Sequence, residues 1–197
     1  MSDIIDITHG AFQTKHWRKN QKWYINGKKN ECELYQKRLL NVIVPYDILP
    51  TKDRINLFTY NICNDLQPMK KLDGYEWSET FDGKLIINDI TYYFNLKFVC
   101  DSGGAQTRTL RECYHFIYGQ LMHEINKKSD ITHNYYINIF DGDECYKNMK
   151  KFKYLISKKV FKDIRKYFYV GCMYDFVDSN IAKNTFLINE KQCDTQD

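Results

Sequence analysis

Apolar residues recur every three to four positions between residues 110 and 125, and this spacing predicts a long amphipathic helix. The stripe consists of Leu110, Cys113, Tyr114, Ile117, Tyr118, Leu121, Met122 and Ile125. An apolar stripe of this period is typical of a helix that lays one face on a core. Thr107 or Thr109 is expected to cap its first turn.

Two apolar runs before this helix predict a β-hairpin. Residues 84–87 and 90–99 flank Asn88-Asp89, and both of these residues tolerate the positive φ that a two-residue turn requires. The stretch from residue 82 to residue 124 therefore combines a strand, a tight turn, a second strand, a loop and the helix.

The register of the hairpin decides which polar side chains meet. With the two-residue turn, Asp82 lies opposite Asn95, and cross-strand partners have Cβ atoms roughly 4.5–5.5 Å apart. Asn95 and Lys97 share one face of their strand, so all three side chains would cluster. A second register stays open, because Asp82-Gly83 is itself a turn dipeptide that can close a hairpin between residues 75–81 and 84–88.

A glycine-rich loop joins the hairpin to the helix. Paired glycines, Gly103 and Gly104, let a backbone approach another group closely. Gln106, Arg108 and Arg111 follow at the helix start, where N–H groups and guanidinium groups favour phosphate. The loop is predicted to bind phosphate, and a plain connection with solvated side chains is the alternative.

The remaining pattern predicts one domain. Helices are expected over residues 31–40 and 54–65, and strands over residues 75–81, 135–140 and 167–171. The predicted fold class is α/β (α+β), with a mixed central sheet flanked by helices. Residues 1–30 form a basic and aromatic arm, residues 31–188 the single domain, and residues 189–197 a polar tail.

Positive charge gathers in two places. Residues 147–166 carry many lysines, among them Lys150, Lys151 and Lys153, and the arm mixes basic residues with Trp17 and Trp23. Such mixtures hold phosphates and stack on bases. The alternatives are a solvated helix face and rings packed onto the body. The formal net charge of +4 permits a nucleic-acid partner without requiring one.

The seven cysteines include no Cys-x-x-Cys pair. An odd, scattered set indicates reduced thiols in an intracellular protein. The acidic start does not resemble a signal peptide, and no apolar run reaches the roughly 18 residues of a membrane span, so no membrane partner is expected.

The order of elements, with polar groups on the hairpin, resembles the PD-(D/E)XK nucleases, the restriction-endonuclease-like family. That family places an Asp at the start of one hairpin strand and an acid-x-Lys on the next. The matching residues here are Asp82 and Asn95-Leu96-Lys97, within a resemblance that spans residues 70–145. Stretches such as Phe-Asp-Gly and Gly-Gly-Ala-Gln-Thr-Arg are similar to type II restriction enzymes of bacteria and large DNA viruses.

The resemblance implies a Mg²⁺-dependent endonuclease that cuts double-stranded DNA at specific sites as a homodimer. It also implies a location in the cytoplasm of a bacterium or of a virus-infected cell. Asp82 would bind Mg²⁺, and Lys97 would orient or deprotonate the attacking water, with burial lowering the pKa of the lysine towards that role.

This sequence departs from the family pattern at Asn95, which stands where the family has an acid. An amide oxygen still ligates Mg²⁺, but it carries no charge, and Mg²⁺ favours carboxylates. We therefore expect Glu79 or Glu112 to supply the second acid, with Asn95 as an auxiliary ligand. Two alternatives are a DNA-binding protein that has lost catalysis and a viral structural or interaction protein.

Other polar residues favour ordinary roles. His115 and His123 lie two turns apart without a visible third ligand, which favours a structural role over zinc. Residues 141–144 favour a polar turn over a metal site. Asp82 as a turn residue and Lys97 as a solvent-exposed residue are the corresponding plain interpretations of the main candidates.

Overall fold

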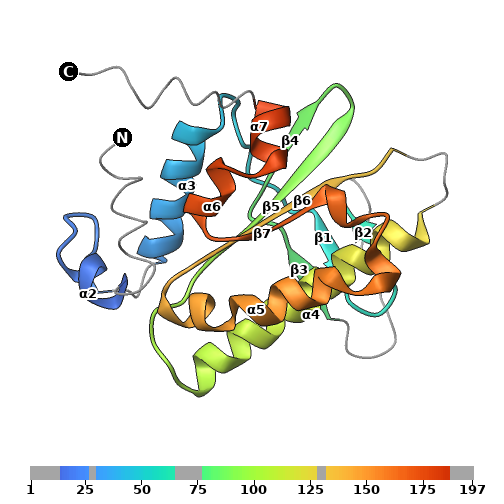
Figure 1. The fold of residues 1–197 in the computed structure, drawn as a ribbon. Helices are drawn as coiled ribbons and strands as arrows, with labels where there is room; N and C mark the ends of the chain where they lie inside the picture. The colour runs from blue at the N-terminus through green and yellow to red at the C-terminus, as the bar shows by residue number, and fades with distance from the viewer. Residues whose placement is uncertain (1–13, 27–29, 65–76, 128–131, 187–197) are drawn as a thin grey trace.

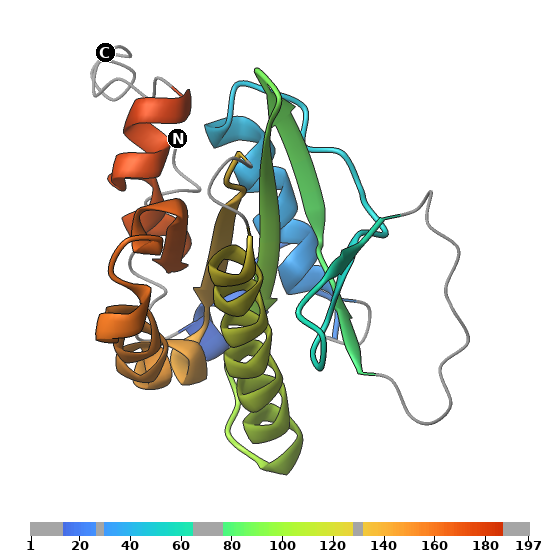
Figure 2. The same cartoon turned by 90° about the vertical axis from the view of Figure 1, so that its right-hand side faces the viewer.

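The computed structural model describes residues 14–26, 30–64, 77–127 and 132–186. Its centre is a four-stranded sheet in the order β4 (Gly83–Ile87), β5 (Ile90–Phe98), β6 (Tyr135–Asp141) and β7 (Phe168–Gly171). β4 pairs antiparallel with β5, whereas β5, β6 and β7 are parallel. Helices cover both faces of the sheet (Figure 1, Figure 2). The predicted mixed sheet flanked by helices is confirmed.

One face of the sheet is covered by α4 (Gly104–Asn126) and α5 (Asp143–Ser157). These helices are the crossovers from β5 to β6 and from β6 to β7, and they lie side by side (Figure 1). Crossovers of one hand between successive parallel strands place their helices on the same face. Ile117 and Leu121 of the predicted stripe are fully buried there, against Phe140 and Phe152.

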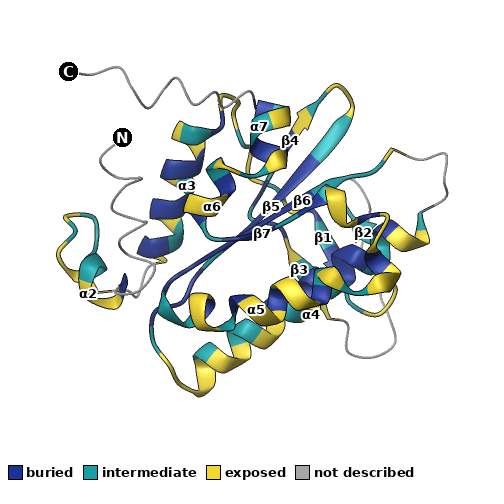
Figure 3. Ribbon diagram, viewed as in Figure 1, coloured by how far each residue is buried: buried dark blue, intermediate teal, exposed yellow. Residues whose placement is uncertain are grey.

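The other face is covered by α3 (Glu31–Ile43), α6 (Met173–Val177) and α7 (Asn180–Phe186). α3 buries Tyr35, Leu39 and Leu40, which pack with Phe94 and Leu96 of β5. The helix predicted over residues 31–40 is therefore confirmed and runs three residues further. Figure 3 shows the buried inner side of α3 and the exposed outer sides of α4 and α5.

A second, three-stranded sheet has the order β2 (Ile62–Cys63), β1 (Arg54–Asn56) and β3 (Ser78–Thr80). The helix predicted over residues 54–65 is wrong. The Asn56 side-chain oxygen accepts hydrogen bonds from the backbone N–H groups of Phe58 and Thr59, and this turn brings β2 back onto β1. Asn side chains compete with helical hydrogen bonding in this way.

The hairpin has the register that the two-residue turn predicts. Asn88 and Asp89 have φ of 49° and 64°, and Ile87 pairs with Ile90. Both positive φ values are those of a type I′ turn. The alternative register is wrong, because β3 pairs with β1 and not with β4.

The first turn of α4 is not capped by a threonine side chain. Gly103, with φ of 155°, occupies the N-cap position, a backbone geometry that favours glycine. The hydroxyls of Thr107 and Thr109 donate back to the carbonyls of Gly103 and Ala105. The capping prediction is therefore wrong.

Two predictions concern segments at the ends of the chain. Residues 1–13 of the arm and the whole tail at residues 189–197 lie outside the described residues. Within the part of the chain that the structure describes, no helix is long and apolar enough to cross a membrane.

Candidate active site

Asp82 lies where the chain passes from the small sheet into β4. Its backbone N–H donates to the Phe94 carbonyl at 2.9 Å, and its carboxylate accepts the Leu96 N–H at 2.8 Å. Because Leu96 directly precedes Lys97, the second bond ties the carboxylate to the end of β5 that carries the lysine. The two residues predicted to act together are thus brought together by the hairpin.

Lys97 is half-buried, and its charge is held by carboxylates. Burial disfavours the ammonium, but Asp82, Glu33 and Glu79 outweigh burial and raise the pKa of Lys97 above its ordinary value. The predicted lowering of this pKa is therefore wrong. No ion pair within 4 Å joins Lys97 to any residue in the described ranges, so the lysine is a charged group surrounded by acids without being locked to one of them.

Both acids that were predicted to replace the missing one lie in this neighbourhood. Glu79 comes from β3 and Glu112 from α4. Burial and then repulsion by Glu112 raise the pKa of the Glu79 carboxyl, Asp82 adds to the rise, and Lys97 opposes it. A like charge at short range disfavours the ionised form of the Glu79 carboxyl.

A fourth acid, Glu33 of α3, was not predicted. Burial raises the pKa of its carboxyl, Lys97 lowers it, and Asp82 raises it again. Along the sequence Glu33 is one more charged residue in a helical first turn, and only the packing of α3 on β5 brings it near Lys97. We refer to Glu33, Glu79, Asp82 and Glu112 as the acidic cluster.

The acidic cluster offers the donor type that Mg²⁺ prefers. Carboxylate oxygens are its usual protein ligands, and a cation would relieve the repulsion that adds to burial in raising the pKa values of Glu33 and Glu79. In the described residues, however, no three Asp, Glu, His or Cys side chains lie close enough together to hold an ion. The donor chemistry fits Mg²⁺, whereas the present spacing does not enclose one.

Asn95 is buried in β5, two residues before Lys97. Its amide nitrogen donates to the Asn138 side-chain oxygen at 2.9 Å, and Asn138 exchanges two hydrogen bonds with Gln120 of α4. This amide network joins β5, β6 and α4. The Asn95 side-chain oxygen accepts no hydrogen bond from the residues that the structure describes, so its role as an auxiliary ligand stays a prediction.

The predicted phosphate-binding residues lie on the helical layer formed by α4 and α5. Gly103, Gly104, Arg108 and Arg111 are exposed at the start of α4, and Gln106 is half-buried. On α5, Lys150 and Lys151 are exposed, and Lys153 reaches Asp175 at 3.8 Å. Their contacts with DNA stay a prediction.

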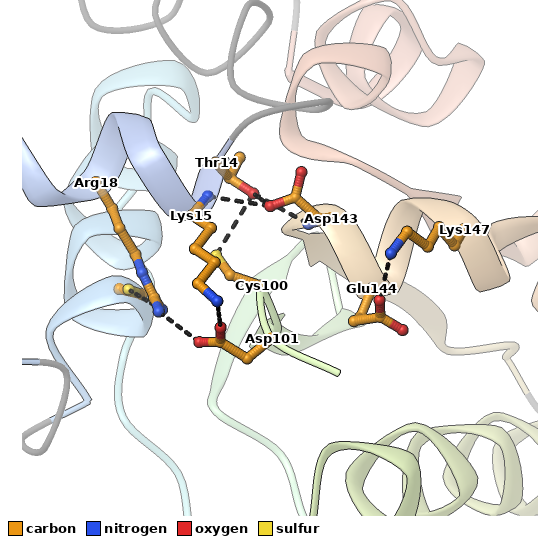
Figure 4. Close-up of polar contacts among 9 residues, drawn as sticks. Thr14, Lys15, Arg18, Cys100, Asp101, Asp143, Glu144 and Lys147 are labelled. Carbon is orange, nitrogen blue, oxygen red and sulfur yellow. Dashed lines mark hydrogen bonds and ion pairs between the residues drawn. The ribbon is translucent and has the colours of Figure 1, made fainter. Parts of the chain in front are cut away.

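The N-terminal arm docks on the carboxyl ends of β5 and β6 through α2 (Thr14–Lys19) (Figure 4). The Thr14 hydroxyl and the Lys15 N–H both donate to the Asp143 carboxylate, while the Asp143 N–H donates to the Thr14 oxygen at 3.0 Å. Lys15 and Arg18 also pair with Asp101 at 2.6 and 2.7 Å. The starts of α2 and α5 thus cap each other.

Two tryptophans fix the arm further. Trp17 and Trp23 pack against Tyr35 of α3, with ring centroids 5.6 and 4.5 Å apart. Of the two interpretations of the arm, packing of its rings onto the body is therefore the one that the structure supports. Both indoles are half-buried in this position.

The remaining polar candidates have ordinary partners. His123 Nδ1 bonds to the Tyr60 carbonyl at 2.7 Å, and burial lowers the pKa of this histidine. Asp141 accepts bonds from Gln36 and Met173, and Asp143 belongs to the cap described above. Both arrangements agree with the structural roles that the sequence favoured.

Comparison of the chain with protein-family models, curated proteins and solved structures finds no match. The resemblance to PD-(D/E)XK nucleases therefore stays a prediction, and any functional assignment depends on the geometry of the acidic cluster and Lys97.

Proposed function

We propose that this chain is a Mg²⁺-dependent endonuclease of the restriction-endonuclease-like kind, which hydrolyses phosphodiester bonds of double-stranded DNA at specific sites. One observation carries the proposal: the half-buried Lys97 lies in the combined field of Asp82, Glu33 and Glu79, which come from the turn before β4, from α3 and from β3. Groups with shifted pKa values that converge from separate elements are typical of functional sites.

Each residue has a chemical task in this proposal. Hydrolysis needs a nucleophilic water and neutralisation of the charge that develops on the phosphate, and Mg²⁺ bound by the carboxylates would supply both. Lys97 remains an ammonium, so it acts as a cation that orients water and stabilises the phosphate, and not as the base. The Leu96 N–H holds the Asp82 carboxylate in place.

A homodimer is part of the proposal. Cutting both strands of a duplex requires two sites, and a two-fold axis relates two copies of one chain as it relates the two strands of a symmetric site.

Plasmid cleavage in Mg²⁺ tests this function. We expect the wild type to nick or linearise plasmid, and we expect Lys97→Ala and Asp82→Asn each to slow cleavage by about 100-fold or more, the usual effect of removing one electrostatic group from an active site. Asp89→Asn makes the same change as Asp82→Asn, but at the exposed turn of the same hairpin, and should cleave like the wild type. Undiminished cleavage by Lys97→Ala would contradict the proposed site.

One finding favours a second candidate, a DNA-binding protein without catalysis. In the described residues no three acids approach closely enough to hold an ion, and the position of the family acid is Asn95. This candidate predicts that the wild type binds duplex DNA with strong salt dependence and leaves plasmid intact in Mg²⁺. Cleavage that depends on Lys97 would exclude it.

A further inference from the structure

A groove of about 670 Å³ runs between the N-terminal part of α4 and the facing side of α5. Its walls include Arg111 and Tyr114 from α4, and Lys150, Lys151 and Tyr154 from α5. This volume is typical of ligand clefts, which measure roughly 300–1,000 Å³. The amide and acid groups of the proposed active site are not among the residues that line it.

The groove is electropositive. Arg111 and Lys150 make no hydrogen bond or ion pair with any other described residue, and Lys151 bonds only to the neutral Asn148 side chain at 2.7 Å. Glu144 is the acid that lines the groove, and Lys147 already pairs with it at 2.6 Å. The groove therefore presents three cations that no carboxylate of the described residues neutralises, a charge that complements a chain of phosphates.

The groove also has an aromatic wall. Tyr154 is 66% exposed, although it is a large apolar ring on a helix that buries Phe152 and Leu155. Lys158 lies over the Tyr154 ring, with Nζ 5.9 Å from its centroid. An exposed ring beside unpaired cations is the arrangement on which proteins stack the bases of a single strand.

We propose that this groove, which we call the α4–α5 groove, binds a single-stranded segment of nucleic acid, with phosphates on Arg111, Lys150 and Lys151 and a base stacked on Tyr154. A base can stack on a side chain only when it is not paired and stacked within a duplex. A space between two packed helices admits a single strand but not the full width of a duplex.

This proposal deepens the proposed function, because it gives the substrate an unpaired segment next to the duplex that is cut. Arg111 and Glu112 are neighbours in α4, so the helix separates the groove from the acidic cluster by no more than its own width, about 10–12 Å. A strand leaving the groove over α4 would reach the acidic cluster.

Fluorescence polarisation in EDTA tests the groove without any requirement for cleavage. The probes are a labelled oligothymidylate, a duplex of the same length and an oligoglutamate peptide. We expect the wild type to bind the oligothymidylate most tightly. The double variant Arg111→Gln/Lys150→Gln should weaken this binding by about tenfold and reduce the salt slope by about 0.7 for each phosphate that it no longer neutralises.

Tyr154→Ala should weaken oligothymidylate binding by about tenfold as well, since each stacked base contributes an effect of this order. Arg38→Gln on α3 and Tyr174→Ala on α6 are matched controls, because both residues lie on the opposite face of the sheet and outside the groove, Tyr174 with 47% of its surface exposed. Both control variants should bind like the wild type.

Three results would overturn the proposal: equal binding by the groove and control variants, tighter binding of the duplex than of the single strand, or tighter binding of oligoglutamate, which would indicate an acidic protein partner. The polarisation assay measures binding and is independent of the plasmid assay. If the wild type binds through the groove but does not cut plasmid, only the proposed nuclease is contradicted. Plasmid cutting without groove binding would count only against the groove.

Discussion

Two sets of carboxylates, Glu124 of α4 and the acidic cluster, differ in how well their charges are satisfied. Glu124, near the end of the helix, has a fully buried side chain that pairs with Lys127 at 2.9 Å and with His133 at 2.8 Å. The Tyr136 hydroxyl donates to the same carboxylate at 2.9 Å. Both oxygens of this buried carboxylate therefore have a partner.

The acidic cluster, to which α4 contributes Glu112 in its N-terminal half, has the opposite character. Glu33, Glu79 and Glu112 make no hydrogen bond or ion pair with another side chain in the described ranges, and burial and mutual repulsion raise the pKa values of the first two. A satisfied buried charge holds a fold together, whereas unsatisfied charges cost stability and persist where they serve binding or catalysis. The difference agrees with a structural role for Glu124 and with the cation-binding role that we propose for the acidic cluster.

The largest change in the free energy of unfolding is expected for Glu124, the carboxylate with buried partners. Glu124→Ala should lower the free energy of unfolding by about 3–5 kcal/mol, because it leaves Lys127 and the Tyr136 hydroxyl without their buried partner. Glu112→Ala, at an exposed position of the same helix, should change stability by no more than about 0.5 kcal/mol. Urea denaturation of the three proteins measures both values, and equal losses would erase the distinction between the two sets.

Much of the fold follows from local patterns. The stripe in α4, the turn at Asn88-Asp89 and the apolar run of β6 are each specified by residues close in sequence, and all three were predicted correctly. The failure at residues 54–65 also has a local cause. There the Asn56 side chain turns the backbone, and apolar spacing alone does not reveal that hydrogen bond.

The candidate site was predictable only where it depends on the hairpin. Turn length sets the register, and the register places Asp82 beside the strand of Lys97. Glu33 was missed because its position depends on the packing of α3 against β5, a contact between distant parts of the chain. The direction in which the pKa of Lys97 moves was missed for the same reason, since it is the net result of acids from several elements.

Asp141 resembles Glu124 in its burial but has no cationic partner among the described residues. Its contribution to the free energy of unfolding should therefore depend on pH. It is fully buried and accepts bonds from Gln36 at 2.6 Å and from the Met173 N–H at 3.0 Å, and no described cation forms an ion pair with it. Burial raises the pKa of its carboxyl from 3.8 to about 6. In the window between these values the folded state binds more protons than the unfolded state, so stability falls as pH rises.

Over that window Asp141 should cost the wild type about 3 kcal/mol, because a pKa difference of one between the folded and unfolded states corresponds to about 1.36 kcal/mol. Asp141→Asn should lack this decline, and urea denaturation of both proteins across the window measures the difference. Asp101→Asn is the control of opposite sign. The hydrogen bond from Lys15 lowers the pKa of Asp101, so its contribution to wild-type stability is lost as pH falls. If the stabilities of the wild type and of Asp141→Asn change with pH in parallel, the two hydrogen-bond donors satisfy the Asp141 carboxylate fully.

Apart from the Glu112→Ala control, the smallest change in stability is expected for Glu33 and Glu79 of the acidic cluster, and it should have the opposite sign to that of Glu124→Ala. Both Glu33 and Glu79 have folded pKa values above the ordinary 4.5, so their contribution to stability declines as pH rises above that value. Glu33→Gln/Glu79→Gln should therefore be more stable than the wild type at neutral pH, by no more than about 1 kcal/mol because both groups are partly solvated. This advantage should disappear near pH 4.

The response of the melting temperature to Mg²⁺ tests whether the acidic cluster binds a cation or only lowers the stability of the protein. A cation that binds the folded wild type raises its melting temperature, and removal of two carboxylates should abolish that rise. We expect Mg²⁺ to stabilise the wild type and to leave the double variant unchanged, even though the variant is the more stable protein without metal. If both proteins respond equally, the ion binds elsewhere. If the double variant is less stable at neutral pH without metal, Glu33 and Glu79 are structural acids like Glu124.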